Sequence, residues 1–323
     1  MVFIIKRGDL NSFLEEIASS RQLIAPLKKD LAKFLPTKPE QVKDIYLKTN
    51  TYFPVKEYFF RKKEIIFKFK DKKIEQPKLE FPERIFFGLR RCDLNGVMHQ
   101  DKVFTEQVHD PYYVAMRKNS ILIGYHCNTA PSKYCFCGTL KLADFHDLMF
   151  FDKEDHFLVE VGSEKGRKLL EEFKKYFKES SLVITPEQKV IPGADRLLKD
   201  DITGLYDHPD WQKGVSQCLS CGACTNLCPT CYCFEFHDEV KTSDLKEGER
   251  VRDWSSCQVL DFTRVAGDHV FRQKRDERFK HRIFHQLEYF KEKNGINLCT
   301  GCGRCIQGCP TRIDFVEIIN EMK

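Results

Sequence analysis

The chain has 323 residues, with 41% hydrophobic and 31% charged residues and a formal net charge of +5. This composition is typical of a soluble globular protein of about two domains, and it excludes a disordered chain. The balance of 53 basic against 48 acidic residues argues against a nucleic-acid partner, because a nucleic-acid-binding domain is strongly basic.

No apolar run approaches the ~18 residues that a membrane span requires. The first residues, MVFIIKRGDL, contain too short an apolar patch for a signal peptide. Fifteen cysteines without an export signal are typical of a reducing compartment. We therefore expect a cytoplasmic protein with no membrane partner.

The N-terminal part of the chain predicts a mixed α/β domain that spans residues 1–190. Residues 1 to about 35 show a helical pattern, with Leu10, Phe13, Leu14 and Ile17 on one face. Strands are expected at 44–49, 64–70, 85–89, 120–127 and 181–185, and a hairpin at 147–161. Helices are expected after residue 89, at 110–120 and at 162–180. The proline-containing stretch 186–195 marks the domain boundary.

Four cysteines of this domain form a candidate ligand set for a third [4Fe–4S] cluster: Cys92, Cys127, Cys135 and Cys137. The first two follow predicted strands, where functional sites of α/β sheets tend to lie, and the last two share a loop. A zinc site and buried structural thiols are the alternatives, since free cysteine is often a small buried hydrophobe.

Residues 191–323 contain the pattern C-x2-C-x2-C-x3-C-P twice, as CLSCGACTNLCP and CTGCGRCIQGCP. Bacterial-type ferredoxins hold [4Fe–4S] clusters with this spacing, and the fourth cysteine of each copy ligates the other cluster. The spacing therefore predicts one cluster on Cys218, Cys221, Cys224 and Cys309. It predicts a second cluster on Cys299, Cys302, Cys305 and Cys228.

Zinc and disulfides explain the doubled pattern less well. A third cysteine at the same step in both copies is superfluous for a four-ligand zinc site. Disulfide frameworks are typical of small secreted chains.

Three further cysteines lie between the two motifs: Cys231, Cys233 and Cys257. They are candidate ligands of a metal centre, with Asp238 or Asp253 as a non-cysteine ligand. Alternatively, they tune the first cluster by packing and S–H contacts. The basic stretch 271–282 is interpreted as a solvated helix face.

Helical patterns are expected from 196 to 218, within the long gap between the motifs, and at the C-terminal end. Compact ferredoxins place their two motifs closer together in a small β-ribbon fold. The predicted fold class is therefore α+β: a mixed α/β domain followed by an α-helical ferredoxin domain with two [4Fe–4S] clusters.

The chain resembles the iron–sulfur beta subunit of cytoplasmic sulfhydrogenases and the corresponding iron–sulfur subunit of anaerobic sulfite reductase. The resemblance covers nearly the whole chain and rests on GLRRCDLNGV, CPTCYCF, GERVRDWSSCQVLDF, VAGDHVFR and the closing CTGCGRCIQGCPTRID. The joint occurrence of CPTCYCF and DWSSC is its most specific part. One departure is Arg91, where many relatives have proline or alanine.

The resemblance implies an electron conduit that performs no bond chemistry. Its partners would be a flavin (FAD)- and NAD(P)-binding subunit and the catalytic subunit of a NiFe hydrogenase or a sulfite reductase. Arg304, inside the second motif, would raise a cluster potential through its charge. The alternative is an iron–sulfur enzyme that reduces sulfur or a disulfide at a cluster with one iron lacking a cysteine ligand. The sequence contains no G-x-G-x-x-G after a strand, so we expect any nucleotide on a partner.

Overall fold

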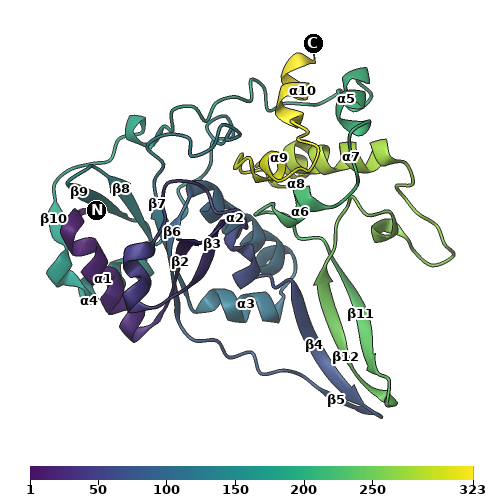
Figure 1. Cartoon of the computed structure of the whole chain (residues 1–323), viewed down its shortest axis with the longest axis horizontal. Coiled ribbons are helices and arrows are strands. Elements are labelled where there is room, and N and C mark those ends of the chain that lie inside the picture. Colours follow the sequence, from purple (N-terminus) through teal and green to yellow (C-terminus); the bar gives the residue numbers. More distant parts are fainter. Residues whose placement is uncertain (323) are drawn as a thin grey trace.

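The structure is a computed structural model, and it describes residues 1–322. Its largest layer is an eight-stranded mixed sheet in the order β10-β1-β9-β8-β7-β6-β2-β3 (Figure 1). The four central strands β8, β7, β6 and β2 are parallel, and the outer strands pair antiparallel. The carboxyl ends of the parallel strands therefore meet at one edge of the sheet.

The strands of this sheet are β1 (Val2–Lys6), β2 (Gln22–Lys28), β3 (Ala32–Thr37), β6 (Arg84–Leu89), β7 (Ser120–Tyr125), β8 (Leu148–Asp152), β9 (His156–Val161) and β10 (Lys178–Ser180). Its covering helices are α1 (Arg7–Ser20), α2 (Arg91–Asp101), α3 (Pro111–Lys118) and α4 (Glu164–Glu172).

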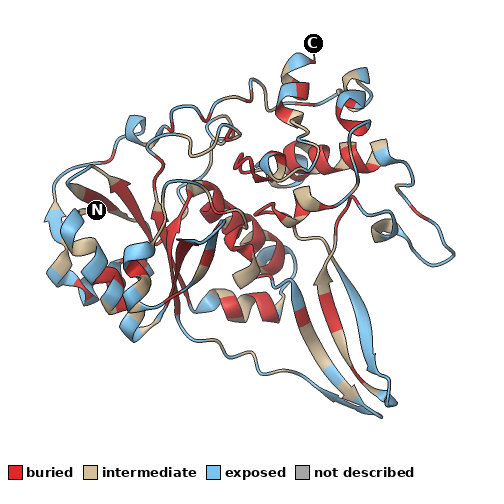
Figure 2. Cartoon of the chain, in the orientation of Figure 1, coloured by how far each residue is buried: buried red, intermediate tan, exposed pale blue. Residues whose placement is uncertain are grey.

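The central strands are buried on both faces, as Figure 2 shows. On β6, Ile85 and Phe87 pack with α1 and α4, whereas Phe86 points to the opposite core beneath α2 and α3. This alternation follows from the two-residue period of a strand. It explains why β6 is a continuous apolar run, as expected for a parallel strand covered on both sides.

A second, four-stranded antiparallel sheet joins the two halves of the chain. Its strands are β4 (Lys63–Lys70), β5 (Lys73–Glu75), β11 (Phe234–Lys241) and β12 (Asp244–Trp254), in the order β11-β12-β4-β5. Strand β12 pairs with β4 from Glu247↔Lys70 to Asp253↔Lys63. The sheet projects from the body of the molecule as a long arm (Figure 1).

The C-terminal part has a separate helical core around the buried Trp211. Its helices are α5 (Gln212–Val215), α6 (Ala223–Asn226), α7 (Arg275–Phe284), α8 (Phe290–Asn294), α9 (Arg304–Gln307) and α10 (Phe315–Glu321). A wider π-helical segment, His285–Tyr289, joins α7 to α8. Phe136 and Leu140 of the N-terminal half also belong to this core. Among residues 1–322, no helix combines the length and apolar character needed to cross a membrane.

Several predicted elements differ from the structure. The predicted helix in residues 1–35 is confined to α1, because β1, β2 and β3 flank it. The segments 44–49 and 181–185 form no strand, apart from one bridge between Ile45 and Leu27, and β10 instead precedes the second segment. The stretch 196–218 is mostly irregular and contains the single turn α5.

The expectation that helices fill the gap between the motifs is wrong for its first part. Strands β11 and β12 occupy it, and helices begin only at α7. The hairpin was missed because seven of the eight β11 residues are exposed and alternate no apolar face, so its stability depends on pairing with the remote strand β4. Residues 64–70, 85–89, 147–161 and the helices α2, α3 and α4 are confirmed.

Candidate metal centre

The two cysteine motifs adopt the same local conformation. Each passes through two left-handed residues into a one-turn helix; these residues are Ser220, Gly222, Gly301 and Gly303. In the first motif, the Ser220 amide points to Cys218 Sγ at 3.4 Å. In the second, the Gly301 amide points to Cys299 Sγ at 3.4 Å. Amide donors directed at sulfur favour the thiolate, so both loops are preorganised to hold metal ligands.

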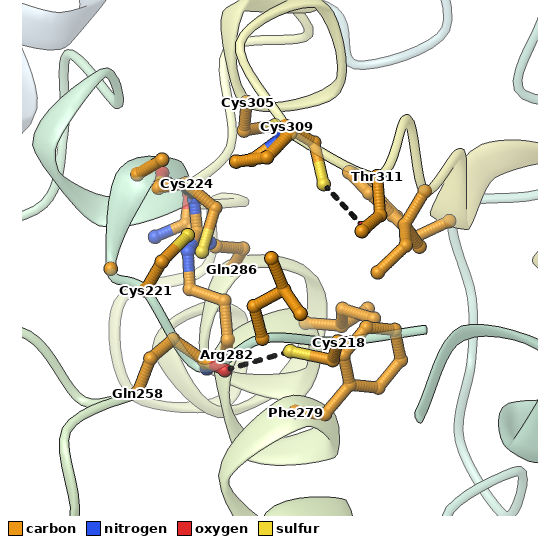
Figure 3. Close-up of a pocket in the computed structure, with 17 residues that line it drawn as sticks. Cys218, Cys221, Cys224, Gln258, Phe279, Arg282, Gln286, Cys305, Cys309 and Thr311 are labelled. Carbon is orange, nitrogen blue, oxygen red and sulfur yellow. Dashed lines mark hydrogen bonds between the residues drawn. The ribbon is translucent and has the colours of Figure 1, made fainter. Parts of the chain in front are cut away.

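The first predicted ligand set lines one cavity, which Figure 3 shows. Cys218, Cys221 and Cys224 line it from the first motif, and Cys309 lines it from the second. The cavity volume is about 70 Å³. One water needs only about 10–15 Å³ on this measure, so the space accepts a larger compact group. The structure therefore brings together the four cysteines that the crossed arrangement predicts.

The second predicted set also lies together, in a more buried position. Burial raises the pKa of Cys299 to about 12, and the neighbouring Cys228 and Cys302 thiols contribute. Burial likewise raises the pKa of Cys305, with contributions from Cys302, Cys299 and Cys228. Such mutual effects require that the four thiols are neighbours. Cys228 thus lies beside the three cysteines of the other motif.

The N-terminal set Cys92, Cys127, Cys135 and Cys137 is brought together from three separate segments. Cys92 begins α2 directly after β6, and Cys127 follows β7, so both lie at the carboxyl edge of the parallel strands. Burial raises the pKa of Cys135 to about 11, and the Cys302 and Cys127 thiols add to it. Burial also raises the pKa of Cys137, followed by the effects of Cys135 and Cys127.

The loop of Cys135 and Cys137 packs directly on the second motif. The Phe136 amide donates to the Gly301 carbonyl at 2.8 Å. A Cβ atom on Gly301 would lie 2.5 Å from the Cys137 Cα atom, so only glycine permits this approach. Asn50 Nδ2 lies 3.3 Å from the Cys302 carbonyl oxygen and 3.6 Å from Cys135 Sγ. The N-terminal set and the second set are therefore in contact.

The three cysteines between the motifs lie at the base of the β11–β12 hairpin. Cys231 and Cys257 are buried, and Cys233 is half-buried. A hydrogen bond from the Cys257 thiol lowers the pKa of Cys233. Burial alone would raise the pKa of Cys228, but a hydrogen bond from Cys231, together with Arg282 and Lys56, holds it well below its ordinary value. These thiols are therefore neighbours of the second set as well as of one another.

The two carboxylates considered as partners of these thiols have other contacts. Asp238 forms an ion pair with Arg250 on the exposed hairpin. Asp253 Oδ2 lies 3.6 Å from His237 Nε2. The expectation of an aspartate ligand is not supported by these contacts.

Three buried cations surround the cysteines. Arg304 forms an ion pair with Asp93 at 2.9 Å, and both side chains are at most 2% exposed. Lys56 Nζ donates to the carbonyls of Thr225 and Cys231 at 3.1 and 3.0 Å. Arg282 donates to the Cys224 carbonyl at 3.2 Å. Buried cations held by backbone carbonyls suit sites that carry negative charge, as thiolate-ligated iron–sulfur groups do.

The basic stretch 271–282 is thus not a fully solvated helix face. Arg278 and Arg282 are buried, and Arg278 donates to the carbonyls of Gln258, Arg272 and Gln273. Lys56 was missed by the sequence reasoning altogether. The available signal was a single lysine inside the apolar run FPVKEYFF.

The two cysteine motifs and their loops define an iron–sulfur protein. Residues 217–313 match the family described as a 4Fe-4S dicluster domain. Sulfhydrogenase 2 subunit beta of Pyrococcus furiosus is 33% identical over 293 residues, which cover 85% of this chain and 84% of that protein. The chain therefore belongs to the sulfhydrogenase beta-subunit family, as the sequence motifs predict. It is an iron–sulfur subunit that transfers electrons.

A second relative shares a shorter region. The F420-dependent formate dehydrogenase subunit beta of Methanocaldococcus jannaschii is 24% identical over 175 residues, which cover 51% of this chain and 38% of that protein. No solved structure matches the chain.

Proposed function

We propose that this subunit carries three [4Fe–4S] clusters and passes electrons between two partner subunits. The first two are held by the crossed sets of an α-helical ferredoxin domain, residues 191–323. The third is held by Cys92, Cys127, Cys135 and Cys137 of the α/β domain, residues 1–190. When bound, the clusters would supply one-electron transfer.

The order of the three sites follows from contacts between their ligand loops. The first and second sets exchange Cys228 and Cys309, so they share both motifs. The second set and the N-terminal set are joined where Phe136 meets Gly301. The second set is therefore the middle of a three-membered path that ends in a different part of the fold at each end.

The observation that carries this proposal is the convergence of four N-terminal thiols on the second motif. A complete set of four cysteines leaves no iron without a cysteine ligand, so nothing at this site favours the alternative of a sulfur- or disulfide-reducing centre. The site is also buried, with Cys92, Cys127 and Cys135 each at most 7% exposed. Burial suits electron transfer better than the binding of a substrate.

The partners that we propose are a flavin- and NAD(P)-binding subunit and the catalytic subunit of a NiFe hydrogenase or a sulfite reductase. Support for a catalytic partner comes from the names of the two relatives, which are beta subunits of a sulfhydrogenase and of a formate dehydrogenase. We also propose that the complex works in the cytoplasm.

Iron and acid-labile sulfide per chain, with EPR of the reduced protein, test the proposal on material purified without oxygen. Three cubanes require about twelve irons, and two require about eight. A Cys135→Ser variant should lose signal and iron from one cluster, whereas Ser132→Ala in the same loop should not. About eight irons in the wild type would contradict the N-terminal cluster, and zinc with little iron would overturn the electron-transfer role.

A further inference from the structure

Three thiols remain outside the three ligand sets, and all of them meet at the base of one hairpin. Cys231 and Cys233 precede β11, and Cys257 follows β12. The Ser255 amide donates to the Cys233 carbonyl at 2.9 Å, which holds the two ends of the hairpin together. The Cys257 thiol donates a hydrogen bond to Cys233, so these two sulfur atoms are in contact.

Two glutamines connect these thiols to the ferredoxin-type sites. The Gln258 side chain lies 4.0 Å from Cys257 Sγ through Nε2 and 3.8 Å from Cys218 Sγ through Oε1. The Gln286 side chain lies 3.8 Å from Cys231 Sγ through Nε2 and 3.8 Å from Cys228 Sγ through Oε1. In both cases an amide donor is directed at the extra thiol, as it is at metal-bound sulfur in outer coordination shells.

The charge of Lys56 is the second, independent observation. Its side chain is 3% exposed, and its ammonium lies 4.1 Å from the centre of the Trp254 ring. Among residues 1–322, no carboxylate oxygen lies within 4.0 Å of this ammonium; its polar partners are two backbone carbonyls. One of these carbonyls belongs to Cys231, so the cation is placed at the extra thiols.

A buried ammonium without an anion is costly to the fold. Arg304 shows the usual solution, since it pairs with the buried Asp93. Lys56 has no such carboxylate, and the groups beside it are thiols. A negatively charged thiolate centre at this position would supply the missing counter-charge.

We propose that Cys231, Cys233 and Cys257 hold a further iron–sulfur cluster with three cysteine ligands, which Lys56 neutralises. This proposal extends the proposed electron-transfer role by one centre beside the first and second sets. Three thiolates are too few for a closed structural zinc site, which has four ligands. They match the number needed by a three-iron cluster, or by a four-iron cluster whose last iron takes a ligand from outside this set.

The test uses the full-length chain, purified without oxygen with the subunits that accompany it. Native mass spectrometry gives the mass of iron and sulfide on the unmodified chain, independently of whether any variant folds. The proposal expects a mass above that of three cubanes. A mass equal to three cubanes or fewer overturns it.

Variants then show which cysteines hold the additional iron. The Cys233→Ser, Cys257→Ser double variant avoids Cys231, the neighbour of the ligand Cys228. It should lose about three or four irons, while Cys135→Ser should lose about four and retain the additional centre. Unchanged iron in the double variant, or zinc in place of iron, overturns the proposal. Loss of iron in Cys135→Ser alone supports the proposed function without this further centre, so the two failures are distinguishable.

EPR of the oxidised protein separates the two forms of the cluster. A three-iron cluster is paramagnetic when oxidised, whereas four-cysteine cubanes in their ordinary oxidised state are not. A signal that is absent from the double variant and present in Cys135→Ser identifies the three-iron form. Additional iron without that signal identifies the four-iron form.

Discussion

Arg304 and Asp93 form a buried ion pair that joins the second cysteine motif to helix α2. The guanidinium and carboxylate are 2.9 Å apart, and the side chains are 2% and 1% exposed. Arg304 also donates to the carbonyl and the hydroxyl of Thr51. Because Asp93 follows Cys92 and Arg304 precedes Cys305, this pair fixes the N-terminal cysteine set relative to the second set.

Breaking the pair should destabilise the protein strongly. Arg304→Gln leaves the Asp93 carboxylate buried without its partner, at a cost of about 3–5 kcal/mol in the free energy of unfolding. Chemical unfolding of the cluster-loaded protein measures this cost. Arg264→Gln is the control, since Arg264 pairs with Asp261 and Asp268 on the surface, where such pairs contribute about 1 kcal/mol or less. Equal effects of the two variants would contradict a structural role for the buried pair.

The same pair predicts how the chain sets its midpoint potentials. Arg304→Gln should lower the potential of the nearest cluster, because it removes a positive charge that favours the reduced, more negative form. Asp93→Asn should raise it, and the double variant should return close to the wild type, since the pair is neutral as a whole. Redox titration followed by EPR measures all three variants, and shifts of the same sign in both single variants would contradict this electrostatic account.

Lys56 has no carboxylate to balance it, so its removal cannot be compensated in this way. Lys56→Gln should make a midpoint potential more negative, whereas Lys62→Gln, at an exposed position nearby, should leave it unchanged. Redox titration followed by EPR measures both variants. A Lys56→Gln protein with wild-type midpoints would show that this cation does not act on the metal centres.

Gly301 should be intolerant of alanine for a reason beyond its backbone conformation. Its φ is +65°, and a Cβ atom would lie 2.5 Å from both the Cα and N atoms of Cys137. Gly301→Ala should therefore push the Cys135–Cys137 loop away and reduce the iron bound by the N-terminal set. Gly295→Ala is the matched control: its φ is +74° but nothing lies within 4 Å. It should cost only the ~1–2 kcal/mol of left-handed strain and keep its iron. Equal iron losses would contradict the contact.

The sequence was sufficient for features that depend on local spacing. The two motifs place their cysteines within a few residues, and the structure gathers the crossed sets that this spacing predicts. The meeting of Cys92 and Cys127 was also accessible, since both follow strands that could be recognised as buried parallel strands. Their proximity follows from the common direction of β6 and β7.

Features that depend on distant pairing could not be predicted in this way. The hairpin β11–β12 is stabilised by β4, which lies far away in the sequence, and its own residues are mostly charged and exposed. Lys56 reads as an ordinary surface lysine, because the segment that buries it, near Thr225 and Cys231, is supplied by the other half of the chain. Arg282 was interpreted as solvated for the same reason.

Cluster loading should depend on pH because burial keeps the ligand thiols protonated in the cluster-free protein. Burial raises the pKa of Cys135 to about 11 and that of Cys224 to about 11. Iron binds the thiolate, so each of these cysteines must release a proton on loading. Because their pKa values lie above neutrality, the thiolate fraction grows as the pH rises, and loading should be faster at about pH 9 than at about pH 7. The rise of visible absorbance during anaerobic reconstitution measures this rate, and circular dichroism of the cluster-free protein at both pH values controls for a change in folding. A rate that is the same at both pH values, with the fold intact, would mean that proton release from these thiols does not limit assembly.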